Sequence, residues 1–199
     1  MPGLLDSPPL DLAQATRRLH DLRSRGRQLL ALALTLALAG VALAARGGGA
    51  AGVPLLIGSA GALALVGLGR GDRRRLLVAL VAQGDAWALK DVRDLAERLS
   101  GPRERRRLAH GLRAAAAVAA GAQLSMMVNP ARVDVVRDRL NALAERFGDP
   151  LTKVSATAAA ICRRMLCDAQ HSPLYNPHVP EGDLGRILDL LERDLALPS

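Results

Sequence analysis

The chain has 199 residues and a formal net charge of +8, and its cations are almost all arginine, with 25 Arg against two Lys. Only three residues are aromatic, one each of Trp, Tyr and Phe. Soluble β-sheets are rich in aromatic and β-branched residues, so the composition argues against a sheet and predicts an all-α protein. The high content of Ala, Leu and Arg is typical of a GC-rich bacterial coding sequence.

Residues 1–27 are predicted to form a cytoplasmic amphipathic segment. The sequence SPP at 7–9 is a helix-start signal, with a hydroxyl cap and proline in the first turn. Apolar residues then recur at helical spacing on one face, opposite arginines: Leu12, Ala15, Leu19 and Leu22. We expect this helix to lie along a membrane surface or on the later domain, and to continue into the next segment with a bend allowed at Gly26.

Two apolar runs, 28–45 and 53–69, contain no ionisable side chain and are joined by the short sequence RGGGAAG. As a helix, each run is roughly 26 Å long, close to the thickness of the hydrocarbon core of a bilayer. Both are apolar on all sides, unlike a half-exposed helix of a soluble domain. We therefore predict a two-span transmembrane hairpin over 28–69, with a hairpin buried inside a soluble domain as the alternative.

The arginines that flank these runs predict the orientation of the hairpin. Five arginines precede the first run and four follow the second, whereas the connecting loop carries only Arg46. Because positive charge is retained on the cytoplasmic side, both termini are expected in the cytoplasm, at a bacterial inner membrane. Arg73, Arg74 and Arg75, beside the second run, are expected to contact anionic lipid.

Small residues in the second run, Gly58, Gly61 and Ala62, are predicted to pack the two spans closely together. The alternative is that they only reflect the GC-rich composition of the coding sequence. Within the runs, beyond Gln28 at the start of the first, only Thr35 and Ser59 are polar. Paths for ions or polar substrates through a bilayer generally need polar or ionisable groups, so a transport function is not favoured.

Residues 70–199 are predicted to form a cytoplasmic helical domain of about five helices. The second run is expected to continue as a helix to Gly84. Caps and apolar periodicity then predict helices over about 85–99, 102–123, 130–147, 150–165 and 184–195. The helices after Pro130 and Pro150 carry matching apolar seams, which predicts that they pair as an antiparallel hairpin. A third membrane span over 114–128 is the alternative for its segment, but that stretch is short and mostly alanine.

The segment 171–182, HSPLYNPHVPEG, has three prolines and no periodic pattern. Long irregular segments in compact domains are often functional. The simpler interpretation is a packed crossover to the last helix, with Leu174 and Tyr175 buried.

Chemically reactive residues are few. Cys167, His171 and His178 are the only candidates for a metal site, although their spacing matches no zinc motif. Cys162 lies on a different helix face from Cys167, so these two cysteines cannot form a local disulfide. No catalytic or phosphate-binding motif occurs. The sequence therefore predicts a protein that is not an enzyme and has no cofactor.

The arginines near the start of the second expected helix, Arg103, Arg106 and Arg107, are predicted to contact an acidic partner protein or lipid headgroups. No aromatic or base-reading groups accompany them, so nucleic acid is not expected. We therefore predict a non-catalytic scaffold or adaptor that holds a protein partner at the membrane. The alternatives are a small accessory subunit of a transport or secretion complex, and a Cys/His metal or redox sensor. A homo-oligomer is the alternative to assembly into a larger membrane complex.

Overall fold

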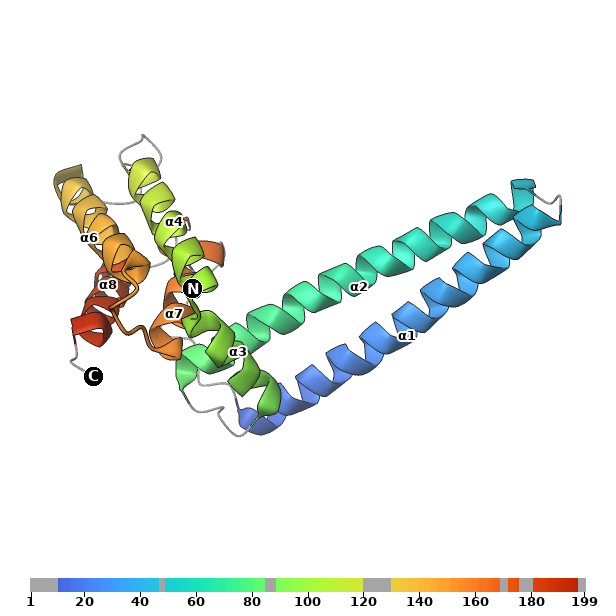
Figure 1. Ribbon diagram of the computed structural model, residues 1–199, viewed down its shortest axis with the longest axis horizontal. Helices are drawn as coiled ribbons and strands as arrows, with labels where there is room; N and C mark the ends of the chain where they lie inside the picture. The colour runs from blue at the N-terminus through green and yellow to red at the C-terminus, as the bar shows by residue number, and fades with distance from the viewer. Residues whose placement is uncertain are drawn as a thin grey trace. The chain divides into compact units, whose positions relative to one another are not determined.

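The computed structural model describes residues 11–46, 49–84, 89–119, 130–168, 172–175 and 181–196, and it is all-helical over them. The helices are α1 Leu12–Ala45, α2 Gly49–Gln83, α3 Lys90–Ser100, α4 Pro102–Ala119, α6 Pro130–Gly148, α7 Ala156–Cys167 and α8 Glu181–Ala196 (Figure 1). The chain divides into two compact units, one formed by residues 10–76 and one that contains residues 77–199. The predicted all-α class is confirmed for the described residues.

α1 and α2 are continuous helices of 34 and 35 residues. The predicted start at 7–9 lies outside the described residues; α1 begins at Leu12, where an Asp11 carboxylate oxygen accepts a hydrogen bond from Ala13 N at 3.0 Å. Neither helix breaks at 27/28 or 69/70, so those predicted boundaries mark a change of chemistry along unbroken helices. α2 ends at Gln83 as expected, because Gly84 has a φ of +76°, which favours glycine.

The described helices of the second unit bury their apolar faces against one another. α4 packs most extensively along α6, α7 contacts α3, α4 and α8, and α8 also contacts α6. The centre consists of side chains with no exposed surface, namely Leu112, Leu140, Phe147, Met165, Ile187 and Leu191. α3 begins at Lys90, directly after Leu89. The cap expected at Asp85 lies outside the described residues, and so does most of the alternative third span.

The predicted helix start at Pro150 is wrong. The Asp149 carboxylate accepts hydrogen bonds from Leu151 N at 3.0 Å and from the Thr152 hydroxyl at 2.7 Å, which stabilises a turn instead. The Thr152 bond is also the main reason why the pKa of Asp149 lies below its ordinary value. Leu151 is consequently 89% exposed. α7 begins only at Ala156, where the Ser155 hydroxyl caps it by accepting from Ala158 N.

The predicted antiparallel pairing of α6 with α7 is also wrong. α6 packs chiefly along α4 instead. Arg105 of α4 contributes to this packing. Its guanidinium donates hydrogen bonds to the backbone carbonyls of Phe147, at 3.3 Å, and of Asp149. Carbonyls at a helix end have no partner within the helix, so Arg105 satisfies groups that α6 itself cannot.

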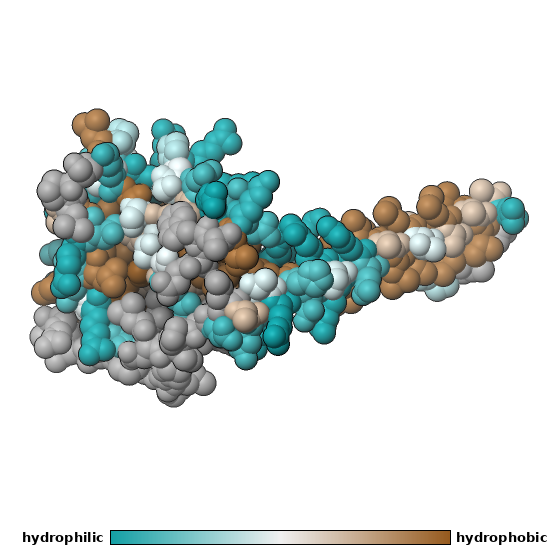
Figure 2. Space-filling model, turned by 90° about the horizontal axis from the view of Figure 1, so that it is seen from below, coloured by the Kyte–Doolittle hydropathy of each residue, from teal (hydrophilic) through white to brown (hydrophobic). Residues whose placement is uncertain are grey.

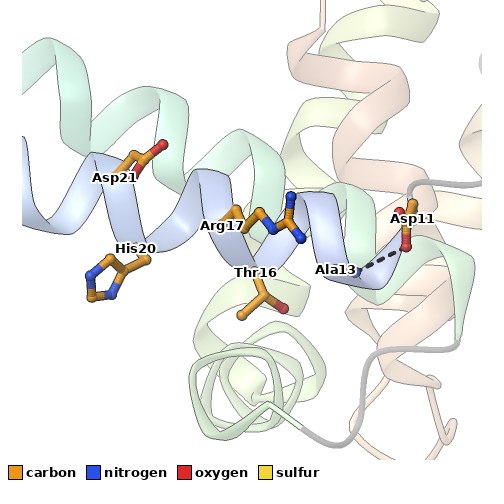
Figure 3. A pocket seen from close by; sticks show the side chains of 6 residues that line it. All are labelled: Asp11, Ala13, Thr16, Arg17, His20 and Asp21. Atoms are coloured by element: carbon orange, nitrogen blue, oxygen red, sulfur yellow. Dashed lines mark hydrogen bonds between the residues drawn. The ribbon is translucent and has the colours of Figure 1, made fainter.

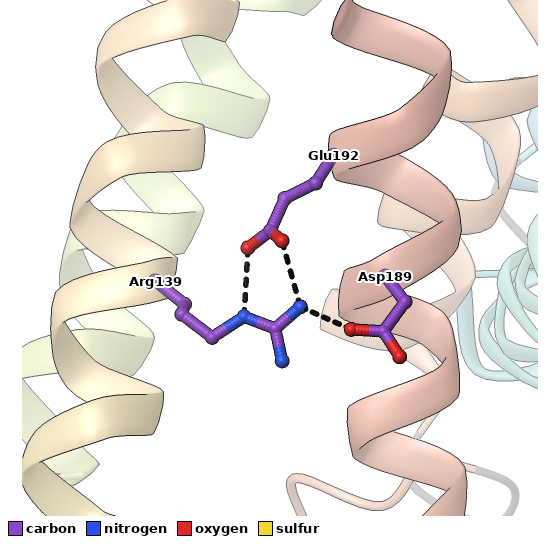
Figure 4. A network of polar contacts seen from close by, with 3 residues as sticks. All are labelled: Arg139, Asp189 and Glu192. Carbon is purple, nitrogen blue, oxygen red and sulfur yellow. Dashed lines mark hydrogen bonds and ion pairs between the residues drawn. The ribbon is translucent and has the colours of Figure 1, made fainter.

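A polar clamp joins α6 to α8 (Figure 4). The Arg139 guanidinium donates to both carboxylate oxygens of Glu192, at 2.7 and 2.8 Å, and to Asp189 at 2.6 Å. The bidentate bond to Glu192 raises the pKa of Arg139 above its ordinary value. Such fork-like pairing fixes orientation as well as distance, so the clamp aligns the last helix with α6.

The described part of the proline-rich segment is packed only in part as expected. Leu174 is buried, but Tyr175 is 42% exposed. The buried Ser172 hydroxyl donates to the carbonyl of Met165 in α7 and accepts from Leu174 N. Ser172 thereby ties this segment to the end of α7.

Candidate membrane interface

α1 and α2 pack along a seam of residues spaced alternately three and four apart. On α1 the buried and partly buried positions include Ala15, Leu19, Leu22, Gly26, Leu29, Ala33, Leu36 and Gly40. On α2 they include Gly52, Leu55, Ser59, Ala62, Val66, Gly69, Arg73 and Leu76. This is the heptad spacing of coiled coils, which keeps one face of each helix against its partner. The two helices run antiparallel (Figure 1).

Two contacts bring the backbones of the seam close together. A Cβ atom placed on Gly52 would lie 2.8 Å from the carbonyl oxygen of Gly40, so only glycine fits at this position. Farther along, the buried Ser59 hydroxyl donates a hydrogen bond of 3.0 Å to the carbonyl oxygen of Ala33 in the facing helix. Small residues and interhelical hydroxyl bonds are the means by which helices associate in membranes.

The packing residues predicted from the sequence only partly coincide with this seam. Ala62 is buried in it. Gly58 is exposed beside it, where an added Cβ would touch Leu36 at 3.4 Å, and Gly61 faces outward with nothing within 4 Å of such an atom. Gly40, Gly52 and Ser59 were not among the predicted packing residues. Their seven-residue spacing from Gly52 to Ser59, matched by Ala33 and Gly40 on α1, was the available signal.

Outside the seam the hairpin exposes large apolar side chains, which colour its outer part, toward the connection between α1 and α2, brown in Figure 2. This apolar belt comprises residues that are each 39–71% exposed: Leu30, Leu32, Leu34, Leu38, Val41, Leu43, Val53, Leu56, Ile57, Leu63, Leu65 and Leu68. Both helices are long and apolar enough to cross a membrane, and only 11% and 22% of their most apolar windows is buried. A core helix of a soluble protein would be mostly buried, so the structure offers no support for that alternative.

The two hydroxyl groups of the apolar runs both donate hydrogen bonds. Thr35 donates to the carbonyl of Ala31 in its own helix at 2.9 Å, and Ser59 to that of Ala33. A hydroxyl that faces hydrocarbon needs such an internal partner, because no water is present to replace it. The hydroxyl groups of Thr35 and Ser59 are therefore compatible with a lipid environment.

A groove of about 470 Å³ lies between α1 and α2 where the apolar belt ends. Its apolar part is formed by Leu22, Leu29, Leu30, Leu65, Val66 and Leu68, with Gly26 and Gly69. Its polar part is formed by Arg23, Arg25, Arg27, Arg70, Arg73 and one acid, Asp72. Of the predicted lipid contacts, Arg73 lines this groove, while Arg74 and Arg75 are exposed on the next positions of α2. At the other end of the belt α1 closes with Arg46 alone.

The first turns of α1 present the polar face of the amphipathic segment. A shallow, open hollow follows this face, and Thr16 and His20, one turn apart, point to the same side of the helix (Figure 3). Ala15 and Leu19 are buried in the seam. The hollow is lined from this one helix by Asp11, Ala13, Thr16, Arg17, His20 and Asp21. The predicted amphipathic pattern thus continues the seam beyond the apolar run.

α4 carries an exposed basic face in the second unit. Arg103, Arg106 and Arg107 are all exposed, and His110 and Arg113 continue this face for two further turns. The opposite side of α4 is buried, which keeps these side chains directed away from the core. The arginines between 103 and 107 therefore have two roles. Arg105 contributes to the packing of α4 against α6, whereas Arg103, Arg106 and Arg107 are surface groups.

The acid within that run is buried. Glu104 is 9% exposed and forms an ion pair with Arg163 of α7, whose side chain is 18% exposed. Arg107 lies 3.6 Å from the other oxygen of Glu104. This pair links α4 to α7 beneath the basic face.

Of the three candidate metal ligands, only Cys167 lies among the described residues. Cys167 is exposed at the end of α7, whereas His171 and His178 lie outside the described residues. Within the described part of the chain, no group of three or more potential ligands occurs. Cys162 is fully buried, and burial raises the pKa of its thiol, which makes it a poor nucleophile.

Comparison with known proteins adds no further information, because no family model, curated protein or solved structure matches the chain. Three features are therefore available for a functional inference: the exposed apolar belt, the arginine-lined groove at one end of it, and the basic face of α4.

Proposed function

We propose that this protein is a non-catalytic adaptor that is anchored in a bacterial inner membrane and holds an acidic protein partner at the cytoplasmic face. The observation that carries the proposal is the apolar belt, with arginines gathered at one of its ends. An apolar surface of this extent is rarely left in water, and lipid chains would cover it completely. The belt and its arginines support two spans over 28–45 and 53–69, with both termini in the cytoplasm.

The proposed partner surface is the basic face of α4, defined by Arg103, Arg106, Arg107, His110 and Arg113. Exposed arginines can pair bidentately with carboxylates, so the complementary surface is an acidic protein. The other face of α4 contributes Leu108 and Leu112 to the core, so the helix is held firmly while it presents its cations. A rigid support of this kind lowers the entropy lost on binding.

The orientation is tested with a reporter that is active only in the cytoplasm. Fused after Ser199, the reporter should be active, and inserted at Gly48, it should be silent. The reason is that Arg46 is the sole cation of the loop, whereas arginines flank both other ends. Activity at Gly48 would contradict the proposed topology, and release of the full chain from membranes by alkaline carbonate would contradict membrane anchoring itself.

The adaptor role is tested by charge reversal on α4. The variant R103E/R106E should lose at least about tenfold of the partner that co-purifies with the full chain in mild detergent, because two carboxylate-binding groups become repulsive. The matched control is R146E/R193E, which reverses two exposed arginines on α6 and α8. Equal capture by both variants would contradict an α4 partner site. A co-purifying set of integral membrane subunits that survives R103E/R106E would instead favour the accessory-subunit alternative.

A further inference from the structure

We propose that the groove between α1 and α2 binds the headgroup of one anionic phospholipid and selects it over zwitterionic lipids. The inference rests on the proposed membrane anchoring and goes beyond it, because a general attraction between arginines and a charged membrane requires no groove. The volume of about 470 Å³ lies within the ordinary range of ligand sites.

The groove exists because the seam lacks side chains at two positions. Gly26 of α1 and Gly69 of α2 both occupy seam positions, where the other helix would normally be contacted. An added Cβ atom would meet nothing within 4 Å at either glycine. At the opposite end of the seam glycines instead bring the helices together, since Gly40 and Gly52 are in close contact. The two helices thus leave room for a ligand at the arginine-rich end.

The charges of the groove fit an anion. Arg25, Arg27 and Arg70 are exposed at its rim and come from both helices, while Asp72 is its only acid. Guanidinium groups match the geometry of a phosphodiester and can bind it bidentately. A zwitterionic headgroup would add an ammonium group to a rim that is already cationic, which disfavours it.

The order of polar and apolar groups along the groove fits a lipid better than a free anion. Leu30, Leu65 and Leu68 line the side toward the apolar belt and are 39%, 54% and 68% exposed. A phosphate among the arginines would therefore place its acyl chains on these leucines. A soluble phosphate would leave the apolar half of the groove without a partner.

The test uses the full chain in bilayer nanodiscs that contain equal amounts of phosphatidylglycerol and phosphatidylcholine. Native mass spectrometry measures the lipid that stays bound after release from the disc. We expect one phosphatidylglycerol per chain on the wild type. Gly69→Leu fills the groove without changing any charge and should lower the bound fraction at least about tenfold. Gly67→Leu is the matched control, because Gly67 is exposed on the same helix with nothing near its Cβ position.

A second pair of variants tests the arginines of the groove without changing the space that Gly69→Leu fills. R25Q/R70Q should also lower the bound phosphatidylglycerol at least about tenfold, since two guanidinium groups that can bind the phosphate are lost. R46Q, at the other end of the belt, should have no effect. Glycerol phosphate at millimolar concentration should not displace the lipid, because it lacks acyl chains.

The outcomes separate this inference from the proposed function. Equal retention of phosphatidylglycerol by Gly69→Leu and wild type would overturn the groove site, as would equal retention of the two lipids by wild type. Displacement by glycerol phosphate would overturn the lipid as ligand and indicate a site for soluble anions. If the wild type inserts into discs in all these cases, membrane anchoring stands while the headgroup site fails. A chain that does not insert contradicts the proposed function first.

Discussion

Phe147→Ala should lower the free energy of unfolding of the helical domain by about 3–5 kcal/mol. Phe147 is the only phenylalanine of the chain, and its side chain is completely buried near the end of α6. Its removal takes away a large apolar contact and leaves a cavity that the packed helices cannot fill. Urea unfolding of the full chain in mild detergent, followed by circular dichroism, measures the change.

The control for this variant is Val135→Ala on the same helix. Val135 is 58% exposed, so its truncation should change the free energy of unfolding by less than about 0.5 kcal/mol. Equal destabilisation by the two variants would show that the side of α6 which carries Phe147 is not the core side.

Glu104→Ala should destabilise the domain by about 3–5 kcal/mol, although it removes a charged residue. Arg163 of α7 is 18% exposed, and without Glu104 its charge would stay largely withdrawn from water and lose its carboxylate partner. The same urea unfolding measures the effect. Asp134→Ala removes the acid of an exposed pair, in which Arg137 lies 2.9 Å from an aspartate that is 75% exposed, and should cost less than about 1 kcal/mol.

A double variant distinguishes the loss of a partner from the value of the pair itself. Replacing both residues with apolar ones, Glu104→Leu with Arg163→Met, leaves no buried charge without a counterion. Most of the stability lost in Glu104→Ala should therefore return. If the double variant is as unstable as the single one, packing around Glu104 rather than the charge of Arg163 dominates.

The sequence predicted helix faces well and helix partners poorly. The spacing of apolar residues in the expected helices puts Leu112, Leu140, Ile161 and Leu191 on apolar faces, and the structure buries all four. Periodicity does not specify which two helices pack together, however. The apolar face of α4 is as suitable a partner for α6 as the apolar face of α7. The start of α7 was misplaced because Asp149-Pro150 fits a turn as well as a helix cap, and the choice depends on local bonds to Leu151 and Thr152.

The seam of the hairpin was difficult to predict for a different reason. Within an apolar run, hydropathy does not distinguish the face that meets the other helix from the face that would meet lipid. Only side-chain size differs between the two faces, and glycine and alanine are common throughout this chain, so Gly61 looked as suitable as Gly52. The groove was equally difficult to predict, because it depends on Gly26 and Gly69 lining the same space from helices whose sequences are far apart.

The bond from Ser59 to the carbonyl of Ala33 also fixes the alignment of the two helices. A slide of α2 by one heptad would bring Val66 to the place of the serine, and valine has no hydroxyl to donate to the Ala33 carbonyl. The same slide would move Gly52 away from Gly40 and bring a bulkier residue against that carbonyl. The alignment of α1 and α2 is therefore determined by one polar bond and one pair of glycines, and not by the length of the connection between the two helices.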